Sequence, residues 1–308
     1  MTRPSSAARE SQSLWASAWR HRRSYLFLVP TFLFLAAFNY LPAISGLYHA
    51  FTEWETGGAA HWIGAGNFQK MAGDEFLRLS IGNQIVLLAA ALVKALVFPL
   101  IAAEMLFHLR SKRMQYALRT LLLIPMVVPG MVGVLLWGFI YDPNIGLLNN
   151  GIAAVGLKSL QRAWLGDWHT ALPAVIGVGF PWISGLALLI YLAGLIAIPQ
   201  DVLDSCAVDG ASGWRRFWSV DLPLVRGQVR LLAALTIIGT LQDFGSLLVL
   251  TGGGPGLATH VPALHMYYQA FRFGHYGYAS AIGFVLFLTI LIFTLTNMRF
   301  GRSAVELN

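Results

Sequence analysis

Six long apolar stretches, separated by short polar segments, constrain most strongly what this chain of 308 residues can fold into. A bilayer core about 30 Å thick is crossed by about 20 residues of helix. The stretches cover residues 25–51, 81–107, 116–140, 171–198, 230–250 and 278–298. Backbone polar groups in lipid must be satisfied within their own segment, so single apolar runs of this length predict helices rather than barrel strands. We therefore expect an all-α integral membrane protein with six transmembrane helices.

The composition agrees with this expectation. Hydrophobic residues make up 56% of the chain and charged residues 11%, whereas soluble domains carry about 25% charged residues. The single cysteine, Cys206, excludes an internal disulfide. The basic N-terminal segment precedes an apolar run that is too long for a signal peptide and is not followed by a small-residue cleavage site. We therefore expect this run to be retained as the first span.

Lysine and arginine are unevenly distributed among the segments between spans. The rich segments hold Arg3, Arg9, Arg20, Arg22 and Arg23, then Arg110, Lys112, Arg113 and Arg119, then Arg215, Arg216, Arg226 and Arg230, then Arg299 and Arg302. The alternate loops hold only Lys70, Arg78, Lys158, Arg162 and Arg272. Cytoplasmic loops carry the basic excess, so both termini are predicted to face the cytoplasm. The predicted organisation is a cytoplasmic segment 1–24, a six-span domain 25–299 with a cytoplasmic loop at about 199–224, and a cytoplasmic tail 300–308.

That cytoplasmic loop contains the sequence DSCAVDGASGWRRFWSVDLPLV, which is charged and patterned although apolar spans flank it. Pro199 ends the fourth span, and the residues after it predict a short helix that Gly210 terminates as a C-cap glycine. Ser212 can cap a second short helix, and Pro223 closes the segment. The pattern predicts a compact helix–turn–helix.

The second helix of the loop carries an aromatic face. Trp214, Phe217 and Trp218 are spaced i, i+3 and i+4, while Arg215 and Arg216 point elsewhere. Such a helix can lie on the anionic cytoplasmic leaflet. It can equally dock into a groove of a cytoplasmic protein, and the ordered acid, glycine and terminal proline favour docking.

The loop resembles the cytoplasmic EAA loop of membrane subunits of binding-protein-dependent ABC importers, with the pattern E-A-A, three residues, Gly, nine residues, I-x-L-P. Here Asp204-Ser205-Cys206, Gly210 and Val220-Asp221-Leu222-Pro223 stand at the matching spacings, with serine and cysteine in place of the two alanines. Five further stretches are similar to the carbohydrate-uptake branch, the maltose- and glycerol-phosphate-type permeases. They are LVPTFLFLAAFNYLPAISGLYHAFTEW, LLLIPMVVPGMVGVLLWGFIYDPNIGLLNN, GFPW, LTGGGPGLATHV and YYQAFRFGHYGYASAIGF.

The resemblance implies a type I importer (MetI-like) permease fold in the cytoplasmic (inner) membrane of a bacterium or archaeon. It implies a second permease, two ATPase subunits, an extracytoplasmic binding protein and a carbohydrate substrate (a sugar, an oligosaccharide or a related polyol). The chain has no P-loop motif, so it is expected to be no enzyme and to hold no cofactor, with ATP and Mg bound by the partner ATPase. The residues implied to couple to that ATPase are Asp204, Ala207, Asp209, Gly210, Ala211, Trp214, Phe217, Leu222 and Pro223.

The resemblance also implies a substrate pathway. Its candidate residues, matched by position to the sugar contacts of the maltose permease, are Gly179, Trp182, Gln242, Asp243 and Phe244. Amide and carboxylate groups suit hydroxyls and an indole suits the apolar face of a sugar ring. Ordinary packing of Trp182 and a structural hydrogen bond of Asp243 are the alternatives.

Charged residues and histidines outside these motifs allow further predictions. Lys94, in the second span, is expected to bond to a partner subunit or line a cavity, and Glu104 to lie at the cytoplasmic interface. His61, His169, His260, His265 and His275 lack metal-site spacing and are expected to be exposed loop residues. An ion-coupled secondary transporter that uses Asp243 is the alternative function, while an intramembrane hydrolase lacks a nucleophile–base or metal constellation.

Overall fold

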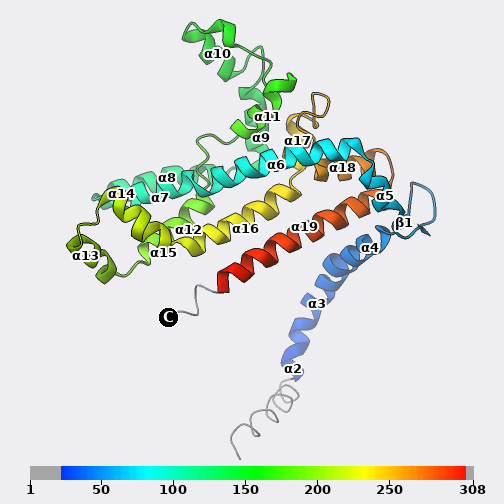
Figure 1. Ribbon diagram of the computed structural model, residues 1–308, viewed down its shortest axis with the longest axis horizontal. Helices are drawn as coiled ribbons and strands as arrows, with labels where there is room; N and C mark the ends of the chain where they lie inside the picture. The colour runs from blue at the N-terminus through cyan, green and yellow to red at the C-terminus, as the bar shows by residue number, and fades with distance from the viewer. Residues whose placement is uncertain (1–21, 303–308) are drawn as a thin grey trace, which may run out of the picture.

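The computed structural model describes residues 22–302, and these are mostly helical (Figure 1). Most of the predicted segments 1–24 and 300–308 therefore lies outside the described residues. The first helices are α2 (Arg22–Tyr25), α3 (Val29–Leu35), α4 (Leu41–His49), α5 (Gly66–Ala72), α6 (Glu75–Leu96), α7 (Phe98–Phe107), α8 (Lys112–Val127), α9 (Gly130–Ile140) and α10 (Leu147–Ala154). They are followed by α11 (Trp168–Gly177), α12 (Gly185–Ile196), α13 (Gln200–Val208), α14 (Gly213–Arg216), α15 (Leu222–Leu224), α16 (Arg226–Gln242), α17 (Gly245–Leu250), α18 (Pro262–Tyr267) and α19 (Tyr276–Arg302).

Short elements connect these helices. Turns of 3₁₀-helix occupy Leu26–Leu28 and Lys158–Leu160, and π-helical turns occupy Ala36–Tyr40, Phe217–Asp221 and Tyr268–Arg272. β1 (Thr52–Glu53) and β2 (His61–Trp62) form an antiparallel pair.

Six membrane crossings can be counted among the described residues, but three of them are not straight. Leu26–His49, Glu75–Phe107 and Tyr276–Asn297 are long and apolar enough to cross a bilayer as single helices. The other three are bent pairs: α8 with α9 at 92°, α12 with α13 at 72°, and the Gly213–Leu224 helix with α16 at 66°. By length and composition the described residues thus allow up to six crossings, in agreement with the predicted number, if each bent pair is counted as one crossing.

Local sequence explains where the helices break. Val128 is extended between α8 and α9 because the following Pro129 disfavours a helical conformation in the residue before it. The chain between α11 and α12 contains Gly179 and Trp182, both with positive φ. Asp243 is extended between α16 and α17. The predicted spans 116–140, 171–198 and 230–250 each contain one of these breaks.

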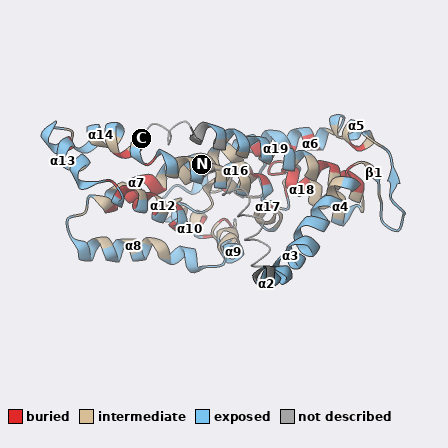
Figure 2. Ribbon diagram, turned by 90° about the horizontal axis from the view of Figure 1, so that it is seen from below, coloured by how far each residue is buried: buried red, intermediate tan, exposed pale blue. Residues whose placement is uncertain are grey.

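The long helices pack side by side. α16 lies between α6 and α19, and α12 packs along α7 (Figure 1). The main buried cluster joins α7 and α12 and includes Leu106, Leu188 and Leu195. Figure 2 shows this burial along α7 and α12, whereas α3 is exposed over its length. Exposed apolar side chains on a membrane crossing face lipid or a protein partner.

Candidate functional site

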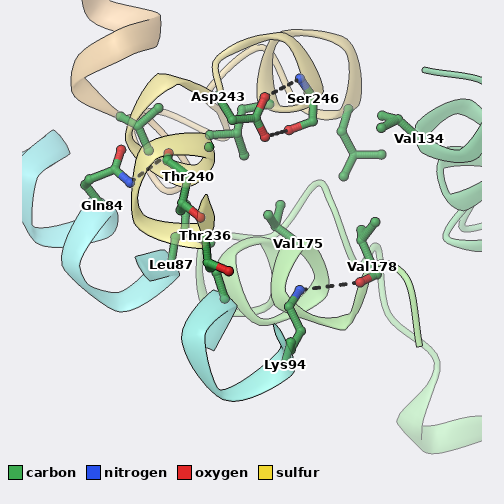
Figure 3. A pocket seen from close by; sticks show the side chains of 15 residues that line it. Gln84, Leu87, Lys94, Val134, Val175, Val178, Thr236, Thr240, Asp243 and Ser246 are labelled. Atoms are coloured by element: carbon green, nitrogen blue, oxygen red, sulfur yellow. Dashed lines mark hydrogen bonds between the residues drawn. The ribbon is translucent and has the colours of Figure 1, made fainter. Parts of the chain in front are cut away.

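A cavity of about 400 Å³ lies between α6, α9, α16, α17 and the end of α11 (Figure 3). Its polar wall residues are Gln84, Lys94, Thr236, Thr240, Asp243 and Ser246. Thr236 and Thr240 are one turn apart on α16, so they share a face. Polar side chains within membrane crossings are costly and characteristically face a cavity or a partner. The structure thus brings these polar groups together around one cavity, a grouping that amino-acid spacing alone did not predict.

Asp243 is the predicted pathway residue that lines this cavity. Its Oδ1 accepts a hydrogen bond from the Ser246 N–H at 3.2 Å, and its Oδ2 accepts one from the Ser246 hydroxyl. The carboxylate therefore caps the first turn of α17 while it faces the cavity from the break between two helices. The sequence left open whether Asp243 forms a structural hydrogen bond. It does form one, but its partner is Ser246 in the same chain segment rather than a residue of a neighbouring helix.

Lys94 faces the same cavity from α6. Its Nζ donates to the carbonyl oxygens of Ile176 at 2.9 Å and Val178 at 3.4 Å. Lys94 was expected to bond to a partner subunit or to line a cavity, and the structure confirms the cavity.

Gln84 contributes a second polar group from α6. This side chain is 5% exposed, and its Nε2 donates to the Thr240 carbonyl at 3.1 Å. Within the described part of the chain, its Oε1 has no hydrogen-bond partner. A buried acceptor without a partner is costly, so Gln84 is a polar group that the protein holds in this wall at an energetic cost. An isolated glutamine in an apolar run was the sequence signal for this residue.

The other four predicted pathway residues do not belong to the wall of this cavity. Trp182 packs on Phe98 and Phe180, with ring centres 4.8 and 5.2 Å apart, and its indole N–H donates to the Gly177 carbonyl at 3.3 Å. The structure thus supplies the packing alternative for Trp182. Gly179 precedes it in the same break with φ of 82°.

Gln242 and Phe244 flank Asp243 but point to other surroundings. Gln242 is exposed at the end of α16. Phe244 stacks on Tyr267 with ring centres 5.0 Å apart and lines a separate crevice between α4, α18 and α19. Adjacent residues diverge here because the chain leaves the helix at Asp243.

The inter-span segment, residues 199–225, connects the bend after α12 to the bend before α16. α13 ends as predicted at a glycine: Gly210 has φ of 68°, and the Ala211 N–H returns to the Cys206 carbonyl at 2.9 Å. Glycine adopts this left-handed conformation without the penalty of a side chain. Ser212 occupies the N-cap position of α14, but its side chain makes no capping hydrogen bond. The predicted helix–turn–helix is therefore confirmed, but the Ser212 side chain does not cap its second helix.

The predicted aromatic face is also present in the inter-span segment. The rings of Trp214, Phe217 and Trp218 contact one another, with centres 5.2 to 5.7 Å apart. Phe217 packs against the main buried cluster, whereas Trp214 is 74% exposed and Trp218 54% exposed. The inner ring fixes the helix to the membrane domain, and the two outer rings remain available for contact.

A charged cluster joins the inter-span segment to α7. Asp221 is fully buried and pairs with Arg216, whose Nε donates to Oδ1 at 3.2 Å. Arg216 also lies 5.5 Å from the centre of the Phe107 ring. Glu104, His108 and Asp221 place donor atoms within 4.8 Å of one another, which is compatible with a metal ion. Arg216 already supplies the positive charge beside Asp221, so a cation would compete with it.

A second cluster lies between the starts of α6, α18 and α19. The Tyr278 hydroxyl donates to Asp74 Oδ2 at 2.6 Å, and His265 Nε2 lies 3.1 Å from the same oxygen. His265 Nδ1 lies 3.2 Å from His260 Nε2. The expectation of exposed loop histidines is wrong for His260 and His265, which are 5% and 6% exposed.

The glycine-rich turn before α18 causes this burial. Gly252, Gly253 and Gly256 have positive φ, so the TGGGPG sequence forms a tight turn. A Cβ on Gly253 would lie 2.6 Å from His260 Nδ1. Only glycine allows the chain to fold back this closely over the histidine.

Comparison with known proteins identifies the family. Residues 95–303 match the family model described as "Binding-protein-dependent transport system inner membrane component". The chain belongs to this family. Its fold class and its resemblance to ABC importer permeases are thereby confirmed, and it is a membrane-embedded transport subunit of such a system.

Individual members of the family match over most of the chain. A probable ABC transporter permease protein, YurN of Bacillus subtilis, is 32% identical over 92% of this chain and 97% of its own length. The multiple sugar-binding transport system permease protein MsmF of Streptococcus mutans is 29% identical over 90% of this chain and 94% of its own. The trehalose/maltose transport system permease protein MalF of Thermococcus litoralis is 35% identical over 60% of this chain and 62% of its own.

A solved structure matches the architecture of this permease. One chain of a bacterial ABC transporter involved in the import of the acidic polysaccharide alginate superposes with a TM-score of 0.82. The match covers 94% of this chain and 98% of the other at 23% identity, so it shows a shared fold.

Proposed function

We propose that this chain is the permease subunit of an ATP-binding-cassette importer that carries a carbohydrate into the cytoplasm. Membership of the family supports the importer. The sugar systems to which MsmF and MalF belong support the carbohydrate. The hydroxyl and amide groups of Gln84, Thr236 and Thr240 in the cavity wall are suited to sugar hydroxyls.

The observation that carries the coupling proposal is the inter-span segment. It is a folded unit with exposed aromatic rings, and bends of 72° and 66° connect it to α12 and α16. A partner that grips this unit can therefore move two membrane helices together. In this proposal Gly210 forms the turn, Trp214 packs on the ATPase, and Asp204, exposed on α13, pairs with a basic group. Ala207, Asp209 and Ala211 border the turn, while Phe217, Leu222 and Pro223 fix the unit to the membrane domain.

The proposed partners follow from this arrangement. A second permease would complete the pore, two ATPase subunits would bind ATP and Mg and hold the two inter-span segments, and an extracytoplasmic binding protein would deliver the sugar. The chain itself would catalyse no reaction. Segments 1–24 and 300–308, which flank the domain 25–299 in the sequence, would face the cytoplasm together with the inter-span segment.

The cavity is the proposed path of the sugar, with Asp243 as its acidic contact. Gly179 and Trp182, in the break between α11 and α12, are also proposed to belong to this path. Gln242 and Phe244, which flank the break at Asp243, are proposed to belong to the same path.

Reconstitution in proteoliposomes tests the proposal. We expect sugar uptake only when the second permease, the ATPase and the binding protein are present and ATP is supplied to the ATPase side. Uptake by this chain alone, driven by a proton or sodium gradient, would instead support an ion-coupled secondary transporter. Two observations disfavour that alternative: Ser246 already bonds both oxygens of Asp243, and the inter-span segment has no role in it.

A further inference from the structure

Lys94 is a charged residue near the middle of a membrane crossing. The crossing formed by α6 and α7 runs from Glu75 to Phe107, and Lys94 lies on the cavity wall within it. Ammonium groups at this depth are costly and characteristically mark a substrate or ion pathway.

Two backbone carbonyl acceptors fix the direction of the Lys94 side chain. Its two acceptors, the Ile176 and Val178 carbonyls, lie at the C-terminal end of α11, where helix carbonyls lack intrahelical partners. The negative end of the helix dipole also stabilises a cation there. An ammonium has three N–H donors, so these two bonds leave one donor for the cavity. Figure 3 shows Lys94 and Asp243 on opposite walls of the cavity.

No carboxylate neutralises Lys94 within this chain's described residues, where its side chain forms no ion pair. The carboxylate of Asp243 shares the cavity but is held by the N–H and hydroxyl of Ser246. The cavity therefore presents an unpaired cation at Lys94. Gln84, a hydroxyl-binding group, lies ten positions earlier on the same helix, about 15 Å along its axis.

We propose that Lys94 is a specificity-determining residue that binds an anionic group, a carboxylate, of the transported carbohydrate. This inference rests on the proposed function and adds the class of substrate: an acidic sugar, such as one that contains uronic acid. A hydrogen bond between an ammonium and a carboxylate is charge-assisted and about twice as strong as a neutral one. The neutral sugar hydroxyls would bond to Gln84, Thr236 and Thr240.

Two substitutions separate ligand binding from the structural bonds of Lys94. Lys94→Gln keeps N–H donors for the Ile176 and Val178 carbonyls but removes the charge. Lys94→Arg keeps the charge. If Lys94 serves only to cap α11, the glutamine variant should behave as the wild type towards every sugar.

The test uses the complete transporter, purified with its own binding protein and reconstituted in proteoliposomes. Two probes are compared: a panel of hexuronate oligosaccharides, and the same panel after its carboxyl groups have been reduced to primary alcohols. We expect the acidic panel to stimulate ATP hydrolysis more than the reduced panel does. Lys94→Gln should raise the half-maximal concentration of the acidic panel about tenfold, which corresponds to loss of one charge-assisted bond. Lys94→Arg should raise it less.

Other outcomes separate this inference from the proposed function. Stimulation by the reduced panel alone would overturn the acidic substrate and leave a neutral carbohydrate importer. Equal responses of wild type, Lys94→Gln and Lys94→Arg to the acidic panel would overturn the role of Lys94. Stimulation by neither panel, in a complex that hydrolyses ATP, would contradict the acidic substrate and leave the importer of another carbohydrate to be tested by uptake. Melting temperature and subunit recovery, measured for each variant, show whether a lost response reflects unfolding.

Discussion

At the scale of single residues, Asp243 combines a local structural task with a place in the cavity. Its two oxygens hold the backbone and side chain of Ser246 and so fix the first turn of α17. A capping carboxylate of this kind contributes about 0.5–2 kcal/mol to a helix. Its negative charge faces the cavity at the same time, and substitution can separate these two contributions.

Replacement of Asp243 should therefore have graded effects. Asp243→Asn keeps an acceptor for the Ser246 N–H and removes the charge, whereas Asp243→Ala removes both. We expect both variants to stay in the assembled complex and to lose substrate-stimulated ATPase activity, with the larger loss in the alanine variant. Stimulation and transport equal to wild type in both would show that Asp243 makes no contact with the substrate.

His260 and Asp74 predict that the cluster they form with His265 and Tyr278 is sensitive to acid. Burial is the main cause that lowers the pKa of His260 from 6.5 to about 4; the neighbouring His265 contributes in the same direction and Asp74 opposes it. Burial alone would raise the pKa of Asp74. Hydrogen bonds from Tyr278 and the Leu77 N–H, together with His265, lower it below 3.8. Both groups bind protons more readily in the unfolded chain, so acid favours unfolding.

We expect the melting temperature of the assembled complex to fall by several degrees as pH drops from 6.5 towards 4. His260 titrates in the unfolded chain at the upper end of this window and in the folded chain at the lower end. His260→Gln, which keeps a hydrogen-bonding group without a titration in this range, should flatten the upper part of the curve. An unchanged slope in this variant would show that His260 does not contribute.

At the scale of secondary-structure elements, the broken helices separate what the sequence predicts from what it does not. Pro129 marks the bend between α8 and α9 in the sequence itself, because proline restricts the residue before it. The break at Asp243 has no proline to mark it, and the Asp243 side chain stabilises the interruption through its bonds to Ser246. The inter-span segment was predictable because glycine, proline and aromatic spacing act locally.

Gly210 is the position where local geometry matters most in that segment. Its φ of 68° disfavours any side chain, although a Cβ there would meet no atom within 4 Å. A left-handed conformation costs a residue with a side chain about 1–2 kcal/mol, and asparagine tolerates it better than valine does. We expect Gly210→Val to insert in the membrane but to lose most ATP-driven uptake, and Gly210→Asn to keep a substantial part. Equal uptake by the two variants would argue against a role for the turn conformation.

At the scale of the whole molecule, the orientation in the membrane follows from charge distribution and awaits a direct test. The only cysteine, Cys206, is buried, so a new surface cysteine can report its own side. Val208 on α13 is 88% exposed, and Glu55 lies in an exposed loop at the opposite end of the spans. An impermeant maleimide should label Val208→Cys in inverted vesicles and Glu55→Cys in intact cells or spheroplasts. The reverse pattern would invert the topology.

The cavity could not be predicted from the sequence in full, because its wall comes from helices far apart in the chain. Gln84 and Lys94 on α6 meet Thr236 and Asp243 only after α16 has packed along α6. Asp243 was found because it stands beside a motif that resembles sugar permeases. Trp182 shared that signal but packs elsewhere, since Phe98 and Phe180 surround its ring.

The central claim is that this permease works only as part of an ATP-driven assembly, and affinity purification from its native membrane in mild detergent tests it most directly. Every co-purifying protein would be identified and the mass of the native complex measured. The account predicts recovery of a second permease and two ATPase subunits. Recovery of this chain alone, as a stable and monodisperse protein, would contradict it.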